Sequence, residues 1–288
     1  MDGKKTLKVL EGPTAVGKTA LAIQWAQEEN TEIVSADSRQ FYREMNIGVA
    51  RPQPEELSAV KHHFIACKSI SEYYSASRYE QEALALLEKL FIHHDTVIMT
   101  GGSGLYVNAL CNGIDALPDP TPQLRETLKK RLAEEGLVSL QEELRRLDPV
   151  FYEIIDLQNP ARLRRALEVC ITTGRPYSSF RTNAKKSRPF RIERYALNRS
   201  KEDLHQRIHL RVDQMMEQGL LEEARTLYPQ RALNALQAVG YRELFGYFEG
   251  KIPLEQAVEN IKTNTRRYAK RQLTWLRKQE DLIWLNAD

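Results

Sequence analysis

Cysteine is scarce in this chain of 288 residues, which has only three. Cys67, Cys111 and Cys170 lie far apart without any CxxC spacing, which argues against a disulfide framework or a structural zinc site and fits a reducing cytosol. Long apolar runs are also lacking: no stretch reaches the roughly 18 residues that a membrane span needs. Residues 1–12 lack the apolar segment of a signal peptide. We therefore expect a cytoplasmic protein with no membrane contact.

Internal repeats and low-complexity tracts are absent as well, which excludes a solenoid or a disordered array. The net charge of +3 is too small to identify a nucleic-acid partner by itself, so the position of the charges matters more than their sum. The hydrophobic fraction of 42% is sufficient for a substantial core. A chain of this length predicts one large domain or two moderate ones.

The first hundred residues alternate between short apolar segments and helical patterns. Residues 6–11, 32–37 and 96–102 read as buried strands, and residues 18–29 and 78–92 as helices. Alternation of this kind is typical of a parallel α/β sheet.

The pattern changes in the middle of the chain. Residues 122–136 and 161–174 have helical periodicity that ends at glycine, residues 191–197 read as a strand returning to the sheet, and residues 200–280 are mostly helical. We therefore predict an α/β core interrupted by a helical insertion. The boundaries are 1–117 and 189–288 for the core and 118–188 for the insertion.

A glycine loop follows the first strand. It matches G-x-x-x-x-G-K-[ST] in full, with glycines that let backbone N–H groups turn towards phosphate oxygens, a lysine that adds positive charge and a threonine hydroxyl for Mg²⁺. This predicts a phosphate site on a P-loop NTPase-like parallel sheet flanked by helices, without naming the reaction. The loop residues are Gly12, Pro13, Thr14, Ala15, Val16, Gly17, Lys18 and Thr19.

Polar residues follow two other strands. Asp37 lies where an open α/β sheet places its active site, and it would either bind Mg²⁺, accept a proton, or merely cap a helix. The strand at 96–102 ends in Thr100 and glycines, without the acid that usually holds Mg²⁺ in a kinase or ATPase, which weakens a nucleotide-hydrolysis function. Ser103, in the glycine turn, offers a hydroxyl to a phosphate or to metal-bound water.

Seven motifs follow one another over nearly the whole chain: GPTAVGKT, DSRQFYREMNIGVARP (37–52), GGSGLY (101–106), NPARLRRALEV (159–169), GRPYSSF (174–180), QAVGYREL (237–244) and TRRYAKRQLTWLRK (265–278). Together they resemble the motifs of the tRNA dimethylallyltransferase family. AKRQLTWLR is the most specific, because generic P-loop proteins lack it. Three positions depart from the family pattern: Ser103 replaces a threonine, Arg51 replaces a lysine, and no acid follows His62-His63 in HHFIACKSI.

The resemblance implies transfer of a dimethylallyl group from dimethylallyl diphosphate to N6 of the adenosine 3′ to the anticodon. The P-loop would then bind the leaving diphosphate, with Mg²⁺ near Thr19 and at least one of Arg207 and Arg211 assisting. These arginines are four residues apart on a predicted helix. Asp37 would take the N6 proton, and Ser103 would position the amine or an oxygen of the donor.

The resemblance also implies that the adenosine is extruded from the tRNA anticodon stem-loop into the core. Residues 262–278 hold seven basic residues and no acids, and residues 158–194 hold ten basic residues against two acids, which suits phosphate contacts. The residues expected to contact tRNA are Asp37, Ser38, Arg39, Gln40, Ser103, Arg125, Ala161, Arg162, Leu163, Arg164, Arg165, Gly240, Tyr241, Arg242, Lys270, Arg271, Gln272, Trp275 and Arg277.

Three alternatives remain open beside a monomeric tRNA prenyltransferase. A prenyltransferase for free adenine nucleotides would share the donor site but would not need AKRQLTWLR or a basic insertion. A P-loop kinase would transfer phosphate from ATP to a small molecule. A non-catalytic tRNA-binding protein is disfavoured by the intact loop and by Asp37. His205 and His209 have the spacing of a zinc pair but lack a third ligand, so we do not expect them to bind metal.

Overall fold

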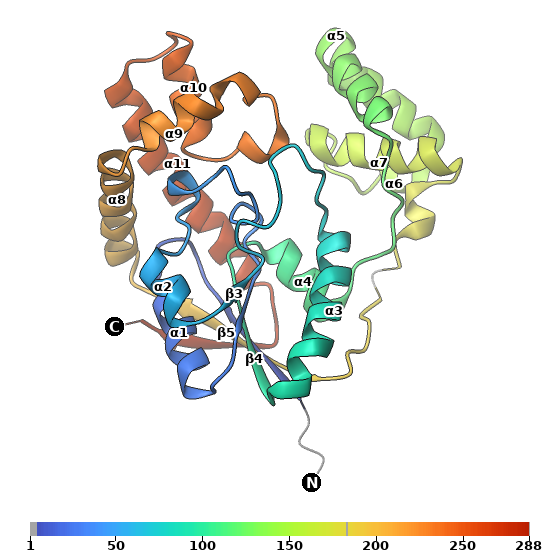
Figure 1. The fold of residues 1–288 in the computed structure, drawn as a ribbon. Coiled ribbons are helices and arrows are strands. Elements are labelled where there is room, and N and C mark those ends of the chain that lie inside the picture. Colours follow the sequence, from blue (N-terminus) through green and yellow to red (C-terminus); the bar gives the residue numbers. More distant parts are fainter. Residues whose placement is uncertain (1–4, 183, 288) are drawn as a thin grey trace. The chain divides into compact units, whose positions relative to one another are not determined.

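The computed structural model describes residues 5–182 and 184–287, which form two compact units (Figure 1). Residues 5–112 and 187–287 make up the first unit, which has an α/β fold as expected. The second unit is helical and spans Gly113–Lys186, whereas we had placed the insertion at 118–188.

One parallel sheet of six strands forms the centre of the first unit, in the order β3-β2-β4-β1-β5-β6. The four inner strands lie where the apolar runs predicted them, whereas the two edge strands were not predicted. The strands are β1 (Thr6–Glu11), β2 (Ile33–Ser35), β3 (His62–His63), β4 (Thr96–Thr100), β5 (Arg191–Asn198) and β6 (Leu282–Asn286).

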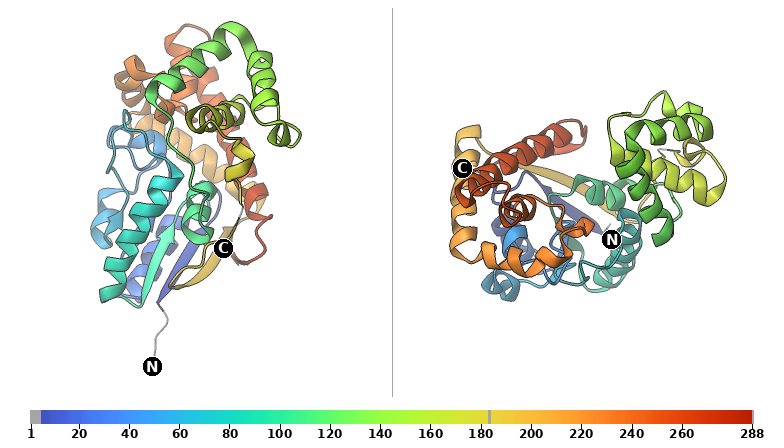
Figure 2. Two further views of the ribbon diagram at one scale, coloured as in Figure 1. Left: turned by 90° about the vertical axis from the view of Figure 1, so that its right-hand side faces the viewer. Right: turned by 90° about the horizontal axis from the view of Figure 1, so that it is seen from above.

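Helices cover both faces of this sheet, as the two views in Figure 2 show. The buried apolar residues of the inner strands therefore contact helices on both faces of the sheet. On one face, Leu7 and Val9 pack against α3 (Ala76–His93) and α4 (Gly104–Asn112). On the other face, Leu10 packs with α1 (Lys18–Glu28), α8 (Lys201–Glu217) and α11 (Leu254–Leu276).

A third apolar cluster lies beyond the end of the sheet, around the fully buried Tyr241. It joins residues of α8 and α11 to shorter elements that the sequence pattern did not resolve. These elements are η1 (Ile47–Val49), α9 (Leu220–Leu227), η3 (Tyr228–Gln230), η4 (Asn234–Leu236) and α10 (Tyr241–Phe248). The short α2 (Pro54–Ala59) follows η1 along the chain.

The second unit contains only helical elements among its described residues, in agreement with the absence of strand patterns. Its first helical segment ends at Gly136, as predicted, and a second segment follows directly. This glycine adopts φ 79° and ψ −176°, so it kinks the chain, which then continues as helix to Leu147. The elements are α5 (Pro122–Leu147), α6 (Pro149–Tyr152), α7 (Pro160–Thr173) and η2 (Tyr177–Phe180).

The buried carboxylate of Asp148 organises one end of this helical unit. It accepts hydrogen bonds from the Phe151 N–H at 3.0 Å and from the N–H and hydroxyl of Ser178 at 2.6 and 2.8 Å. These bonds tie α6 to η2 and satisfy a charge that is fully removed from solvent. None of the helices in the described part of the chain is both long and apolar enough to span a membrane.

Candidate active site

A cavity of about 630 Å³ opens at the carboxyl ends of β1, β2 and β4. This is the edge at which parallel α/β sheets bind their ligands. The P-loop, Asp37 and the Gly101–Gly102 turn line one side of it, and residues 46–53 line another. Residues from three predicted motifs therefore meet in a single cavity.

The P-loop connects the end of β1 to the start of α1, in the strand–loop–helix order that the motif requires. Gly12 and Gly17 adopt φ 152° and 108°, in the range that favours glycine. A Cβ on Gly12 would also lie 2.9 Å from the carbonyl oxygen of Leu197 on β5. Gly17 precedes the first turn of α1, and no side chain caps its N–H groups, which remain available to an anion.

Lys18 folds back over the loop. Its Nζ donates to the carbonyl oxygens of Gly12 and Pro13 at 3.0 and 2.8 Å. Burial lowers the pKa of this ammonium group to about 8, although the negative charges of Asp37 and Glu11 oppose the shift. The charged form is therefore poorly solvated until an anion enters the cavity.

A buried ion pair lies beneath the loop. Glu11, the last residue of β1, accepts hydrogen bonds from Nε and Nη2 of Arg194 at 2.9 and 2.6 Å. Burial raises the pKa of Glu11, and the charge of Arg194 opposes that rise. Removing one partner of such a pair typically costs about 3–5 kcal/mol, so the pair fixes the strands from which the loop departs.

Arginine side chains form hydrogen bonds with residues of the P-loop. Arg207 Nε donates to the carbonyl oxygen of Ala15 at 2.9 Å, and Arg211 Nη1 donates to Thr14 Oγ1 at 3.4 Å. Both arginines line the cavity, and burial together with the neighbouring Arg207 lowers the pKa of Arg211. Sequence reasoning missed a third arginine: Arg199 Nε donates to the carbonyl oxygen of Val16 at 2.8 Å.

Asp37 and Ser103 lie on adjacent loops. Asp37 does not cap a helix, because Oδ1 accepts the Arg39 N–H at 3.0 Å within a turn. Ser103 Oγ accepts the Ser38 N–H at 2.9 Å and bonds to Ser38 Oγ at 3.0 Å. The two strand ends therefore place these side chains together, as the sheet order requires.

The close approach of the two loops depends on glycine. A Cβ on Gly101 would lie 2.4 Å from the backbone of Ala36, which no side chain can accommodate. Thr100, where many P-loop enzymes carry an acid, donates its hydroxyl to the carbonyl oxygen of Leu10 at 3.0 Å. The end of β4 therefore has a structural contact in place of a metal-binding carboxylate.

The cavity wall formed by residues 46–53 is held by Glu223 of α9. Its carboxylate accepts the N–H groups of Asn46, Ile47 and Gly48 at 3.1, 2.8 and 2.9 Å, and the hydroxyl of Tyr241 at 2.6 Å. A Cβ on Gly48 would lie 2.5 Å from the Tyr241 ring. Burial, with the negative charge of Glu223, raises the pKa of Tyr241. One carboxylate thus fixes three consecutive amides of the wall.

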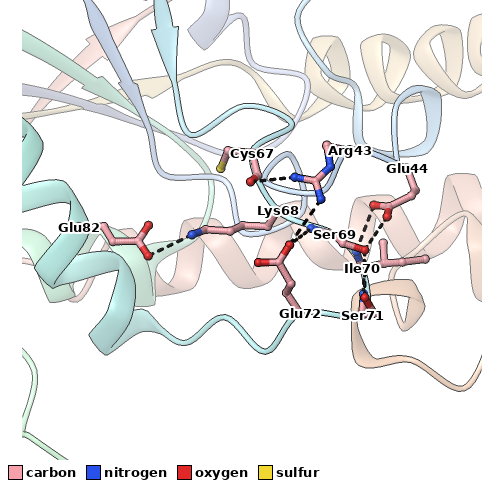
Figure 3. A network of polar contacts seen from close by, with 9 residues as sticks. All are labelled: Arg43, Glu44, Cys67, Lys68, Ser69, Ile70, Ser71, Glu72 and Glu82. Carbon is pink, nitrogen blue, oxygen red and sulfur yellow. Dashed lines mark hydrogen bonds and ion pairs between the residues drawn. The ribbon is translucent and has the colours of Figure 1, made fainter.

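A network of polar contacts anchors residues 43–44 to residues 67–72 (Figure 3). Glu44 accepts the hydroxyl of Ser69 at 2.6 Å and the Ile70 N–H at 3.1 Å. Glu72 accepts the Ser69 N–H at 2.6 Å and pairs with Arg43 at 3.5 Å. These two acids hold the segment after His62-His63, where the sequence lacks the usual family acid.

The model of a known family, described as IPP transferase, matches residues 40–279. The chain belongs to the IPP transferase family. The tRNA dimethylallyltransferase 1 of Phocaeicola vulgatus is 50% identical to it over 283 residues, covering 98% of this chain and 94% of that protein. The tRNA dimethylallyltransferase of Flavobacterium johnsoniae is 51% identical over 288 residues, covering 98% and 93%. The resemblance seen in the sequence is therefore confirmed.

Solved structures agree with this assignment. The full-length tRNA isopentenylpyrophosphate transferase of Bacillus halodurans superposes with a TM-score of 0.71 at 36% identity, covering 98% of this chain and 90% of that one. A eukaryotic dimethylallyltransferase acting on tRNA gives a TM-score of 0.81 at 28% identity, covering 98% and 74%. The predicted fold class, a P-loop-like sheet flanked by helices, is thereby confirmed.

In this IPP transferase, many of the residues expected to contact RNA are exposed. On α11 these are Lys270, Arg271, Trp275 and the adjacent Arg277, and Trp275 is 40% exposed. Arg242 is half exposed on α10. In the helical unit, Ala161 and Arg162 are exposed, whereas Arg125, Arg164 and Arg165 are partly buried.

Four other residues in that set are buried within the fold. Leu163 and Tyr241 are fully buried, and the buried Gly240 donates its N–H to Glu243. Gln272 is 9% exposed and is hydrogen-bonded at both ends of its amide. These positions were grouped with the RNA contacts because they lie in family motifs, and a motif does not distinguish a packing residue from a binding residue.

The residues after Asp37 are also engaged within the protein. Arg39 Nη1 donates to the carbonyl oxygens of Asn234 and Ala235 at 2.9 Å each. Gln40 Nε2 donates to the carbonyl oxygens of Val49 and Ala50 at 3.2 and 2.9 Å. Both side chains therefore help to position the loops that surround the cavity.

Proposed function

We propose that this protein transfers a dimethylallyl group from dimethylallyl diphosphate to N6 of the adenosine 3′ to the anticodon in tRNA, releasing diphosphate. One observation carries the proposal: Asp37 and the Gly101–Gly102 turn line the cavity that also contains the P-loop, and Ser103, which follows this turn, bonds to Ser38 beside Asp37, while the end of β4 lacks an acid. The names of the relatives and the membership of the family support it.

The diphosphate half of the donor would occupy the P-loop. The N–H groups at the start of α1, the Lys18 ammonium and the guanidinium groups of Arg207 and Arg211 all converge there. Neutralising charge on the departing diphosphate eases cleavage of the allylic C–O bond. The P-loop would therefore stabilise a leaving group instead of a transferred phosphoryl group.

The residues around Thr19 fit a magnesium ion whose ligands come largely from the bound diphosphate and from water. The described residues contain no cluster of three or more His, Cys, Asp or Glu that could hold a metal. Mg²⁺ needs no such cluster, because it keeps several waters and binds substrate phosphates with few protein ligands. Thr19 lines the cavity at the start of α1 and would provide a hydroxyl. When bound, the ion would supply further neutralisation of the diphosphate.

The acceptor half of the reaction would use Asp37 and Ser103. The N6 lone pair forms a bond to the allylic carbon, the C–O electron pair leaves with the diphosphate, and Asp37 takes the N6 proton. General-base assistance of this kind contributes about 10²–10⁴-fold to a rate. Ser103 would orient the amine from the adjacent loop.

The RNA would bind through exposed basic residues of α11 and of the helical unit. Lys270, Arg271 and Arg277 would contact phosphates, which gives an affinity that falls with salt. The target base would leave its stack to reach Asp37. We further propose that one chain suffices for the reaction, as a monomer, and that it acts in the cytoplasm.

Mass spectrometry of an anticodon stem-loop tests the proposal. Enzyme, Mg²⁺ and dimethylallyl diphosphate should add one dimethylallyl group to the adenosine 3′ to the anticodon, and ATP in place of the donor should give no modified RNA. Product on free AMP but not on RNA would favour the nucleotide prenyltransferase instead. Phosphoryl transfer from ATP without prenylated RNA would refute the proposal.

A further inference from the structure

A single buried side chain joins the two loops between which the reaction is proposed to occur. Gln272 lies on α11, far from both loops in sequence. Its Oε1 accepts the Thr14 N–H of the P-loop at 2.9 Å, and its Nε2 donates to the carbonyl oxygen of Gly102 at 2.8 Å. The amide thus bridges the phosphate-binding loop and the glycine turn that carries Ser103.

The contact is tightly fitted. A Cβ on Gly102 would lie 2.6 Å from Gln272 Nε2 and 4.0 Å from Asp37 Oδ2. The bridging amide therefore packs directly on the glycine, next to the Asp37 carboxylate. An amide is planar and carries its donor and its acceptor at a fixed separation, so the bridge sets the distance between the two backbones.

Two other side chains that form hydrogen bonds with the P-loop come from α8. Arg207 and Arg211 hold Ala15 and Thr14 from α8, but neither is shown bonded to the glycine turn. Gln272 has a hydrogen bond to each of the two loops. Lys270 and Arg271 of the same helix are exposed. One helix, α11, therefore has basic residues at the surface and the bridging glutamine in the interior.

We infer that Gln272 is a positioning residue that holds the diphosphate site in register with Asp37 and Ser103. This inference rests on the proposed function. In a transfer between two separately bound groups, a misplacement of about 1 Å can cost about 10²-fold in rate. The bridge acts through the backbone of Thr14 and Gly102, and it does not touch the reacting atoms.

Two variants and one control separate positioning from general stability. Gln272→Met keeps the length of the side chain and removes both hydrogen bonds. Gln272→Glu keeps an acceptor for the Thr14 N–H and regains a donor for the Gly102 carbonyl oxygen only when its carboxyl group is protonated. Gln256→Met makes the same change at an exposed position of α11. The side-chain amide of Gln256 donates a hydrogen bond to Asn260, one turn further along the same helix.

The assay is single-turnover prenylation of an anticodon stem-loop at saturating donor and RNA, measured from pH 6 to pH 9 for each variant as a ratio to the wild type. We expect Gln272→Met to be at least tenfold slower at every pH, with the KM for RNA within twofold of the wild type. Gln272→Glu should also be at least tenfold slower, because an ionised carboxylate cannot donate to the Gly102 carbonyl oxygen. Gln256→Met should match the wild type.

Outcomes that overturn the inference are distinct from failure of the proposed function. A wild-type protein that makes no prenylated RNA would refute the proposed function itself. With an active wild type, a Gln272→Met rate within twofold of it would overturn the positioning role. A Gln272→Glu rate within twofold of the wild type would do the same, since that variant has lost the donor to the Gly102 carbonyl oxygen.

Discussion

Replacing Lys18 by methionine should change how the stability of the ligand-free protein depends on pH. The ammonium group donates to two backbone carbonyls of the P-loop, and burial lowers its pKa from 10.5 to about 8. In the unfolded chain the same group titrates near 10.4. Between these values the folded state binds fewer protons than the unfolded state, so stability rises with pH across this window.

The magnitude follows from the shift. Each unit of pKa corresponds to about 1.4 kcal/mol, so a shift of roughly 2.5 units corresponds to at most about 3 kcal/mol. Below pH 8 the lysine is charged in both states and the wild type carries the whole penalty. Towards pH 10.5 the penalty disappears, because the lysine of the folded state is then neutral.

Urea unfolding of the wild type and of Lys18→Met, from pH 7 to pH 10.5, measures this effect as a difference that cancels the titration of all other groups. The free energy of unfolding of the wild type should rise relative to that of the variant by up to about 3 kcal/mol. A difference that stays constant or falls over this range would refute the reasoning.

Adding inorganic pyrophosphate gives a second test of the same group. An anion in the P-loop stabilises the charged lysine, so pyrophosphate should stabilise the wild type more at pH 7 than at pH 9.5. The kcat/KM for the donor should likewise fall above pH 8, where the free protein loses the proton. Binding of pyrophosphate that does not weaken above pH 8 would contradict a role for the Lys18 charge.

Three further substitutions test other parts of the site. Asp37→Asn should lower kcat by about 10²–10⁴-fold while fluorescence anisotropy shows RNA affinity within twofold, and normal turnover would exclude Asp37 as the base. Glu223→Ala leaves three N–H groups of the cavity wall without their acceptor. Urea unfolding should therefore show a loss of about 2–4 kcal/mol in the free energy of unfolding, and kinetics should show a raised KM for the donor. Unchanged stability would contradict the role of Glu223 in holding the wall. Arg271→Ala should lower the salt dependence of RNA binding by about one unit of log–log slope with kcat retained, whereas an unchanged slope would remove Arg271 from the phosphate contacts.

The four inner strands could be predicted from sequence because β1, β2 and β4 are short segments rich in apolar residues that end in glycine or polar residues, and β5 follows the helical insertion with apolar residues at Ile192, Tyr195, Ala196 and Leu197. The edge strands could not. β3 has only two residues, and β6 has exposed side chains at Ile283 and Trp284, so neither has the periodicity of a buried strand. Their pairing is a property of the assembled sheet, and no local pattern encodes it.

The candidate site could likewise be predicted only in part. Asp37 and Ser103 follow strand ends, and parallel strands bring such ends to one edge, so their proximity could be inferred from topology. Glu223 and Gln272 support the site from helices that are 170 or more residues away along the chain from the backbone groups they bind. Contacts over such separations depend on tertiary packing, which a single sequence does not display. Its place in a family motif marked Gln272 as important, but the motif does not indicate which groups the side chain contacts.

The arrangement of charge around the P-loop suits release of a diphosphate better than attack on one. Lys18 and Arg207 bond to carbonyl oxygens of the loop itself, so their charges are in place before any ligand arrives. Such preorganised charge acts where negative charge develops, at no cost of reorganisation. Hydrolysis of a nucleotide would also require a group to orient water near the end of β4. The Thr100 hydroxyl there is directed to the backbone of Leu10, while Asp37, the proposed base, follows β2 next to Ser38, which bonds to Ser103.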